Sequence, residues 1–281
     1  MRMQSSFSSL CRGFIIPKEV DKDTTAHFLD TVGQFARIVN DTGLVHLRRL
    51  VGDEITGTEN KAGLVEKYFC LSMENTTALE DIELGDDGLR VGDKHVSVHT
   101  LSELDALPGK VGTDCRYERL STDKSDCKLS FASPVGLLLS CNHLYNQYIF
   151  LDDSGENLQR FEKNARNMQS LSKYSRSNQI NKEWIDLYLN DAHSFGLTSV
   201  RAHCNIIAWT DNPMEVKNMR NDVGSQIAMM ECKPRHNTVD AATLYWAAMP
   251  GNGADFPAEE SFYTFIEQAL CFWVEETNYR S

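Results

Sequence analysis

Two histidines in an alternating segment are the first residues that could do chemistry. In His95-Val96-Ser97-Val98-His99 both imidazoles fall on one face if the segment is a strand, because strand side chains alternate between faces. Imidazole is a common ligand of zinc and copper. Rings spaced this way along a strand lie too far apart to close easily on one ion, and no third ligand is evident. We therefore expect no metal site here.

A cysteine beside a histidine raises the question of nucleophilic catalysis. A cysteine hydrolase needs a thiolate that a positioned imidazole activates. His203 and Cys204 are adjacent in the chain, so on a strand they face opposite sides and cannot form that pair. The eight cysteines contain no C-x-x-C motif, and we expect buried, reduced thiols. Another of the eight histidines could approach a cysteine through the fold, so a cysteine-dependent hydrolase stays open as a third alternative.

Paired carboxylates stand on either side of an apolar segment near the end of the chain. They are Glu259-Glu260 and Glu275-Glu276. Such pairs do acid–base work only where burial or like charge separates their pKa values. The first pair falls in the opening turn of an expected helix, where the helix dipole favours negative charge. We interpret these carboxylates as structural.

Motifs that bind nucleotide phosphates are missing from the sequence. A phosphate-binding loop reads G-x-x-x-x-G-K-[ST], and the one Gly-Lys pair, Gly109-Lys110, has Leu104 in place of the first glycine and Val111 after the lysine. No G-x-G-x-x-G motif occurs either, since Gly251-Asn252-Gly253 is followed by Phe256 where that motif needs a third glycine. These absences predict no nucleotide-binding residue in this chain.

Composition and charge narrow the class of protein. The 281 residues are 41% hydrophobic and 24% charged, as in an ordinary globular protein, and the net charge is -12. An acidic chain argues against a general nucleic-acid surface, which needs clustered lysine and arginine. No segment approaches the roughly 20 apolar residues that cross a bilayer. These features predict a globular protein with no direct nucleic-acid partner.

Two polar segments are candidate partner surfaces. Residues 164–181 are rich in amides, hydroxyls and bases, and the bases to test are Arg166, Lys173, Arg176 and Lys182. The competing interpretation of this segment is a solvated helix face. A second candidate is the edge around residues 143–148, and its residues are His143, Tyr145 and Tyr148.

The elements that must position these residues indicate an α+β fold, with mixed or antiparallel sheets packed against helices. In the first half, periodicity predicts helices over residues 24–41 and 62–71, with a short strand at 44–50 between them. Turn signals around 86–88 and 92–93 predict a hairpin of strands 89–91 and 95–101. The polar stretch 108–128 predicts a loop or a domain boundary.

The second half has stronger signals. Strands are expected at 135–139, 145–151, 197–209 and 227–232, and a long helical segment, in one piece or two, around 154–194. Asp153 followed by Glu156 resembles a capping box, and Asn212 followed by Pro213 predicts another helix start. Residues 239–249 predict a short helix. An aromatic stripe from Phe262 to Trp273 predicts a final helix. We expect two α+β subdomains, residues 1–128 and 129–281.

Several stretches carry a resemblance to a known family. They are 143–151 (HLYNQYIFL), 160–184 (RFEKNARNMQSLSKYSRSNQINKEW), 229–238 (MMECKPRHNT), 245–251 (YWAAMPG) and 259–281 (EESFYTFIEQALCFWVEETNYRS). A weaker likeness extends over residues 1–130, including 109–125 (GKVGTDCRYERLSTDKS). They resemble TraG of Bacteroidetes conjugative transposons, within the CagE/TrbE/VirB family of type IV secretion ATPases.

This resemblance implies a role in conjugation and DNA transfer. In that family a variable N-terminal region precedes a RecA-like motor, and the motor's phosphate-binding loop would follow the position of Ser281. The chain then corresponds to a non-catalytic N-terminal fragment that serves in docking, assembly or regulation of the DNA-transfer machinery. The resemblance implies no catalytic residue, no cofactor and no enzyme activity in this chain, with ATP and Mg²⁺ expected only for the motor. Implied partners are other type IV secretion proteins, its own ATPase domain and further copies of itself. The implied location is cytoplasmic, at the inner membrane through those partners. The alternative is an independent module that binds a small molecule or peptide.

Overall fold

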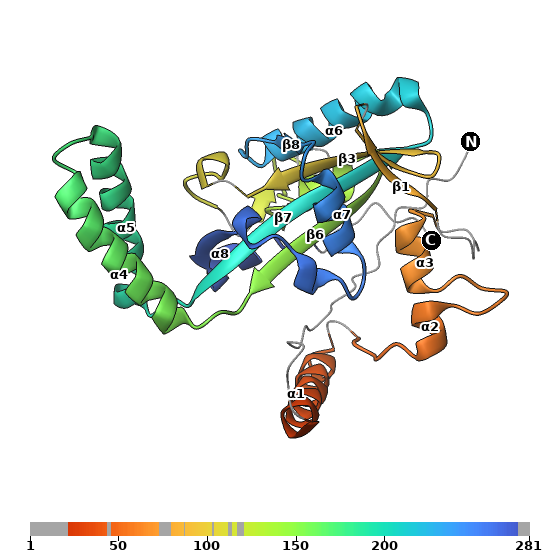
Figure 1. The fold of residues 1–281 in the computed structure, drawn as a ribbon, viewed down its shortest axis with the longest axis horizontal. Coiled ribbons are helices and arrows are strands. Elements are labelled where there is room, and N and C mark those ends of the chain that lie inside the picture. Colours follow the sequence, from red (N-terminus) through yellow and green to blue (C-terminus); the bar gives the residue numbers. More distant parts are fainter. Residues whose placement is uncertain are drawn as a thin grey trace. The chain divides into compact units, whose positions relative to one another are not determined.

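The protein has a mixed α+β fold built on one mostly antiparallel sheet (Figure 1). The computed structural model describes residues 22–43, 46–72, 80–86, 88–102, 104–111, 114–116 and 121–274. Seven strands make the main sheet, in the order β1-β2-β3-β7-β6, with β8 beside β3 and β9 beside β7. The strands are β1 Ile82–Gly85, β2 Gly88–Val91, β3 Lys94–Leu101, β6 Asn142–Phe150, β7 Ser199–Thr210, β8 Arg235–Asn237 and β9 Phe262–Phe265. The expected α+β class is confirmed.

The helices and a smaller sheet complete the description. The α-helices are α1 Lys22–Asp41, α2 Gly52–Thr56, α3 Leu64–Phe69, α4 Ser154–Leu171, α5 Arg176–Phe195, α6 Val216–Met229, α7 Ala241–Ala248 and α8 Ile266–Leu270. Short helical turns are η1 Leu104–Ala106, η2 Pro134–Leu138, η3 Pro213–Glu215, η4 Gly253–Asp255 and η5 Ala258–Glu260. A separate antiparallel pair joins β4 Asp114–Arg116 to β5 Lys128–Ser130, so the expected loop over 108–128 contains a strand.

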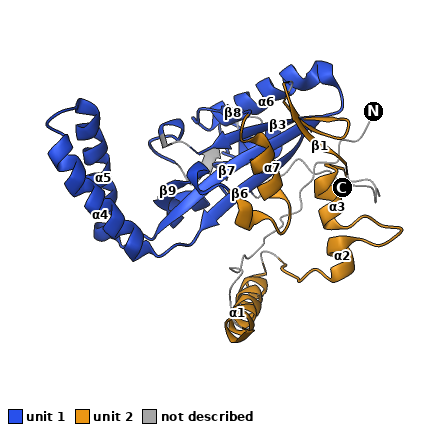
Figure 2. Cartoon of the chain, viewed as in Figure 1, with its two compact units in different colours: residues 1–8, 96–238, 257–281 blue, residues 9–95, 239–256 orange. Residues whose placement is uncertain are grey.

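Two compact units divide the chain, and neither is continuous in sequence (Figure 2). One comprises residues 1–8, 96–238 and 257–281, and the other residues 9–95 and 239–256. The boundary falls within β3. In the second unit, the Tyr245 hydroxyl of α7 shares its one proton between the carbonyls of Tyr68 and Phe69, at 3.2 and 2.9 Å. The division at residue 128 stays a prediction.

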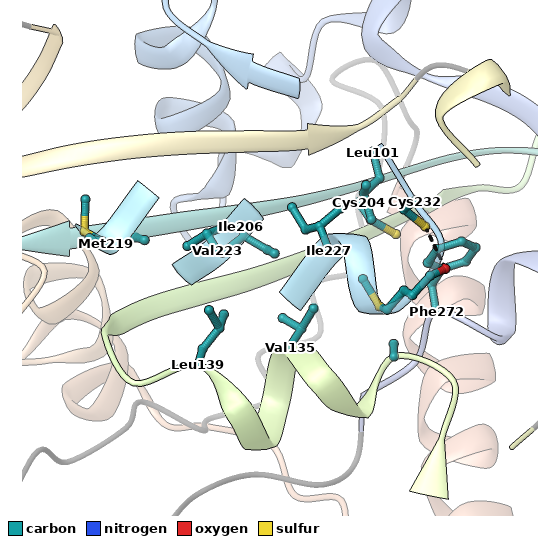
Figure 3. Close-up of a cluster of buried hydrophobic side chains, with 13 residues drawn as sticks. Leu101, Val135, Leu139, Cys204, Ile206, Met219, Val223, Ile227, Cys232 and Phe272 are labelled. Atoms are coloured by element: carbon teal, nitrogen blue, oxygen red, sulfur yellow. Dashed lines mark hydrogen bonds between the residues drawn. The ribbon is translucent and has the colours of Figure 1, made fainter. Parts of the chain in front are cut away.

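The core of the first unit lies against one face of β7. That face carries Cys204, Ile206 and Ala208, which are spaced two apart, as side chains on one side of a strand must be. Helix α6 and the π-helical turn η2 supply the other side, and the cluster is drawn in Figure 3. Its remaining members include Leu101, Val135, Leu139, Met219, Val223, Ile227, Met230, Cys232 and Phe272.

Long β7 organises the strands around it. β6 pairs with its residues Arg201–Trp209, while β9 pairs with Ser199–Ala202. Because Arg201 and Ala202 pair with both strands, β6 and β9 occupy opposite edges of β7. β6 is thus the last strand on its side of the sheet.

Several local predictions are confirmed. The first helix, the hairpin of β2 and β3, and the short helix α7 form where expected. Asp153 caps α4 by accepting a hydrogen bond from the Glu156 amide at 2.9 Å, and Asn212 accepts one from the Met214 amide at 3.1 Å. The expected helical segment is two helices, broken at residues 172–175. Gly196 ends α5 in the left-handed conformation (φ 64°), which glycine adopts without steric cost.

Three predicted strands are wrong. Residues 135–139 fall mostly in η2, a π-helical turn that buries Val135 between α6 and the sheet rather than pairing as a strand. Residues 227–232 complete α6 and its turn, where Ile227 continues the buried face of the helix. Residues 46–50 of the expected strand 44–50 have no regular structure. There the Asn40 side chain donates a hydrogen bond to the Leu47 carbonyl and accepts one from the Leu47 amide. These are the bonds that a neighbouring strand would otherwise make.

The predicted final helix is also corrected. Phe262–Phe265 form strand β9, and only Ile266–Leu270 are helical. Pairing with β7 satisfies the backbone of the first four residues, and a partner strand so distant in sequence leaves no local signal. The carboxylates 275–276 lie outside the described residues.

Candidate functional site

Helices α4 and α5 form an antiparallel hairpin that leaves the sheet and returns to it (Figure 1). α4 begins shortly after β6 ends, and α5 ends shortly before β7 begins, so the connection at residues 172–175 is the end away from the strands. Aromatic rings hold the end of the hairpin next to the strands. The ring centroids of Phe161 and Tyr188 lie 4.9 Å apart, and Tyr188 stacks on Phe265 with 4.3 Å between their ring centroids. Tyr188 also donates a hydrogen bond to the Ser199 hydroxyl at 2.9 Å. The hairpin root is therefore held on several sides.

The far end of the hairpin is basic. Between Glu162 and Glu183 the chain has five lysines or arginines and no acidic residue, in a protein of net charge -12. We call residues 163–182 the hairpin tip. The predicted partner residues Arg166, Lys173, Arg176 and Lys182 all lie on it, so the structure brings these four together on one feature.

These bases differ in how they are neutralised. Lys182 pairs with Asp186 at 2.5 Å, and Arg166 reaches Glu162 only at 4.0 Å with 76% of its side chain exposed. Lys173 and Arg176 are exposed and form no ion pair with any residue that the structure describes. Exposed pairs contribute little to stability, about 0–1 kcal/mol, so neither contact explains the basic tip as a stabilising feature.

An apolar stripe lies beside the bases. Ile180, Trp184 and Leu187 follow one another along one face of α5, and Trp184 and Leu187 are 57% and 60% exposed. Tyr174, in the connection, is 85% exposed. The helical spacing of Trp184 and Leu187 was visible in the sequence, but it did not indicate that they face solvent. Exposed aromatic and aliphatic side chains grouped in this way mark interaction sites more often than scattered ones do.

The second predicted surface is largely internal. Tyr145 is covered by the C-terminal segment, and its hydroxyl donates to the Phe272 carbonyl at 2.6 Å. Tyr148 lies on the other face of β6. Its ring stacks with that of Phe150 and makes an edge-on contact with that of His203, with centroid distances of 6.2 and 5.9 Å. His143 is half-buried, and burial lowers its pKa. These three residues do not form one exposed surface, although they belong to the edge strand as expected.

The two histidines of β3 differ in exposure and do not contact each other. His95 is half-buried, while His99 is 4% exposed, and its near neighbour is His236 of β8 rather than His95. Within the described ranges no group of three or more His, Cys, Asp or Glu residues is arranged to hold a metal ion. No sequence motif pointed to His236, because its approach to His99 depends on pairing of strands far apart in the chain.

His203 and Cys204 lie on opposite sides of β7. Cys204 is in the core under α6, where burial raises the pKa of its thiol to about 12. The pKa of the Cys141 thiol is also raised to about 12, by burial and then by the Asp222 carboxylate. Thiols held in the protonated form are poor nucleophiles. Neither cysteine has the environment that a cysteine hydrolase needs.

No family model matches the chain, and no curated protein matches it. Over the part of the chain that the structure describes, no helix combines the length and apolar character needed to cross a membrane.

Proposed function

We propose that this chain is a non-catalytic docking domain of a conjugative type IV secretion ATPase, the role that its resemblance to that family implies. The domain would hold the motor on other proteins of the DNA-transfer machinery, at the cytoplasmic face of the inner membrane. ATP and Mg²⁺ would bind the motor rather than this chain, which has no phosphate-binding loop in its sequence.

The observation that carries this proposal is the hairpin tip. Its Lys173 and Arg176 are exposed and form no ion pair with any described residue, and the exposed apolar stripe of α5 lies beside them. One of the stretches of resemblance, residues 160–184, spans the tip. A surface of this chemistry complements a partner with apolar side chains surrounded by aspartate or glutamate. Charge complementarity of this kind guides association and selects the partner. We propose that the occupant is another protein of the transfer machinery with such an acidic surface.

A binding experiment tests the tip directly. Arg166, Lys173 and Arg176 are changed together to Glu, and binding of the purified chain to each protein encoded beside its gene is measured by titration calorimetry. We expect one of these proteins to bind the wild type and the triple variant to lose at least about tenfold in affinity, since each reversal replaces an attraction by a repulsion.

A matched control separates the effect of the tip from the effect of a change in the protein's net charge. Changing the exposed Lys110, Lys124 and Lys217 to Glu makes the same change in net charge away from the tip, and should leave the affinity within about twofold. Equal loss in both triple variants would contradict a specific tip. So would binding only to a second copy of this chain, to the motor domain, or to DNA.

The alternative of an independent small-molecule module has one observation in its favour, a pocket beside α6. It does not compete with docking, because the pocket and the tip share no residue.

A further inference from the structure

A pocket of about 530 Å³ lies where α6 faces β3 and β8. Its lining includes Arg220, Gly224 and Ser225 from the helix and His99, Pro234 and His236 from the sheet side. All of these belong to the same compact unit. The volume is in the range of about 300–1,000 Å³ that small-molecule sites occupy.

The shape of α6 explains why there is space. Met219, Val223 and Ile227 form the buried face of the helix and pack into the core. One position further along, the stripe through Arg220 and Gly224 has no bulky apolar side chain. A Cβ atom on Gly224 would lie 3.8 Å from Pro234 Cγ, so the glycine leaves room beside the proline. The pocket therefore forms because one side of α6 lacks bulky apolar side chains, while the neighbouring face of the helix packs into the core.

Two imidazoles meet at this pocket. His99 of β3 and His236 of β8 are direct cross-strand partners, and their ring centroids lie 5.2 Å apart. His99 is 4% exposed, and its Nε2 lies 3.1 Å from the Ser97 hydroxyl. The other nitrogen, Nδ1, has no hydrogen-bond partner among the described residues. When Ser97 donates to Nε2, Nδ1 carries the proton and is a donor without an acceptor.

The pocket has excess positive charge. Arg220 Nε is buried and also lacks a partner among the described residues, and no Asp or Glu lines the pocket. Burial, followed by the nearby charges of His236 and Arg220, lowers the pKa of His99 to about 4. Burial and the charge of Arg220 lower the pKa of His236 as well. An anion in the pocket would satisfy the unpartnered donors and offset the positive charge.

A second pocket in the same unit provides a contrast. It lies at the root of α4 and holds arginines too, but they are already matched. Arg201 pairs with Asp152, with 2.5 Å between Nε and Oδ2, and Arg160 donates to the Asn157 side-chain oxygen at 2.8 Å. Four carboxylates line that pocket: Asp152, Asp153, Glu156 and Glu259. The buried Asn157 Nδ2 of that pocket also lacks a partner among the described residues, so the absence of carboxylates from the lining is what distinguishes the pocket beside α6.

We propose that the pocket beside α6 binds a phosphate group, with Arg220 as the main anchor and His99 and His236 donating to the phosphate oxygens. A phosphate offers more acceptor oxygens than a carboxylate, which suits an arginine and two imidazoles. The volume exceeds what the phosphate group alone fills, which favours a phosphate ester of a small organic molecule. This inference does not depend on the proposed docking function.

Titration calorimetry on the purified chain tests this site with three probes at constant ionic strength: phenyl phosphate, inorganic phosphate and benzoate. We expect phenyl phosphate to bind most tightly and benzoate least. Inorganic phosphate that binds as tightly as phenyl phosphate would still support the phosphate site and would identify free phosphate as its ligand. Absence of saturable binding by both phosphates, or tighter binding of benzoate, would overturn the proposal.

Variants on α6 locate the site. Arg220→Gln should weaken phenyl phosphate binding by about tenfold or more, because it removes a charge-assisted hydrogen bond. Lys217→Gln makes the same charge change on an exposed residue of the same helix and should bind like the wild type. If Arg220→Gln does not fold, His236→Gln replaces it, with the same expected direction of effect. Equal affinity in the pocket and control variants would show that phosphate binds elsewhere.

Discussion

A chain of hydrogen bonds fixes the protonation state of the buried His203. Asn146 Nδ2 donates to Asn205 Oδ1 at 2.8 Å, and Asn205 Nδ2 lies 3.0 Å from His203 Nε2. Since an amide nitrogen can only donate, Nε2 must accept, and the proton of the neutral ring is on Nδ1. Nδ1 then donates to the Glu260 carbonyl at 2.7 Å. The arrangement holds a neutral imidazole in a structural role on the face of β7 opposite Cys204.

The buried histidines predict a defined loss of stability in acid. Burial lowers the pKa of both His99 and His203 to about 4, against about 6.5 for an unfolded histidine. Between these values the unfolded chain binds more protons than the folded one. Their contribution is therefore complete above about pH 6.5 and is lost as the pH falls towards 4, by up to about 3 kcal/mol each.

Urea unfolding at pH 7 and pH 5 measures this loss. His203→Gln keeps a donor and an acceptor but cannot titrate, so the free energy of unfolding should fall less between the two pH values than in the wild type. Comparing the two proteins cancels the general effect of titrating an acidic chain. An identical pH dependence in the wild type, His203→Gln and His99→Gln would show that neither histidine is held neutral.

The first turn of α5 contains a charge that helix stability does not explain. Arg176 is its first residue, and the turn has no acidic side chain. The positive end of the helix dipole disfavours a cation there by about 0.3–1 kcal/mol. Arg176→Glu should therefore raise the free energy of unfolding by roughly that amount or somewhat more, while weakening partner binding.

Chemical denaturation and calorimetry on the same variant test both parts. Arg166→Glu is the comparison, since Arg166 lies within α4, where no such gain is expected. A variant at Arg176 that is less stable, or that binds its partner as well as the wild type, would mean that the base supports the fold rather than docking.

The sequence predicted an element correctly where neighbouring residues in the chain determine its structure. Capping by Asp153 and Asn212 and the turn between β2 and β3 depend on nearby residues, and all three form as predicted. Short apolar runs were less informative, because 135–139 and 262–265 fit either a helix or a strand. Their structures depend on α6 and β7, which lie far away in the chain.

The candidate sites, too, could be predicted only where one continuous segment of the chain determines them. The basic composition of the hairpin tip is visible in the sequence, since it is a property of one continuous segment. Exposure of Trp184 and Leu187 is not visible, because a helical pattern of apolar residues usually indicates a buried face. The pair of His99 and His236 could not be found from spacing, because register between β3 and β8 brings the two rings together.

The two proposed activities belong to separate parts of the molecule. The hairpin tip and the pocket beside α6 belong to one compact unit, yet they share no residue and differ in chemistry. The tip presents an exposed, basic and apolar surface suited to a protein partner. The pocket presents buried donors suited to a phosphate group. Substitutions in one should therefore leave binding at the other unchanged.

The most direct test of the central claim is the frequency of conjugative transfer from donor cells that carry the gene with Arg166, Lys173 and Arg176 changed to Glu. The docking account predicts that transfer falls by at least about tenfold, while the control triple at Lys110, Lys124 and Lys217 transfers like the wild type. Both variants must accumulate to wild-type levels in the cell. Unchanged transfer from the tip variant would contradict the account.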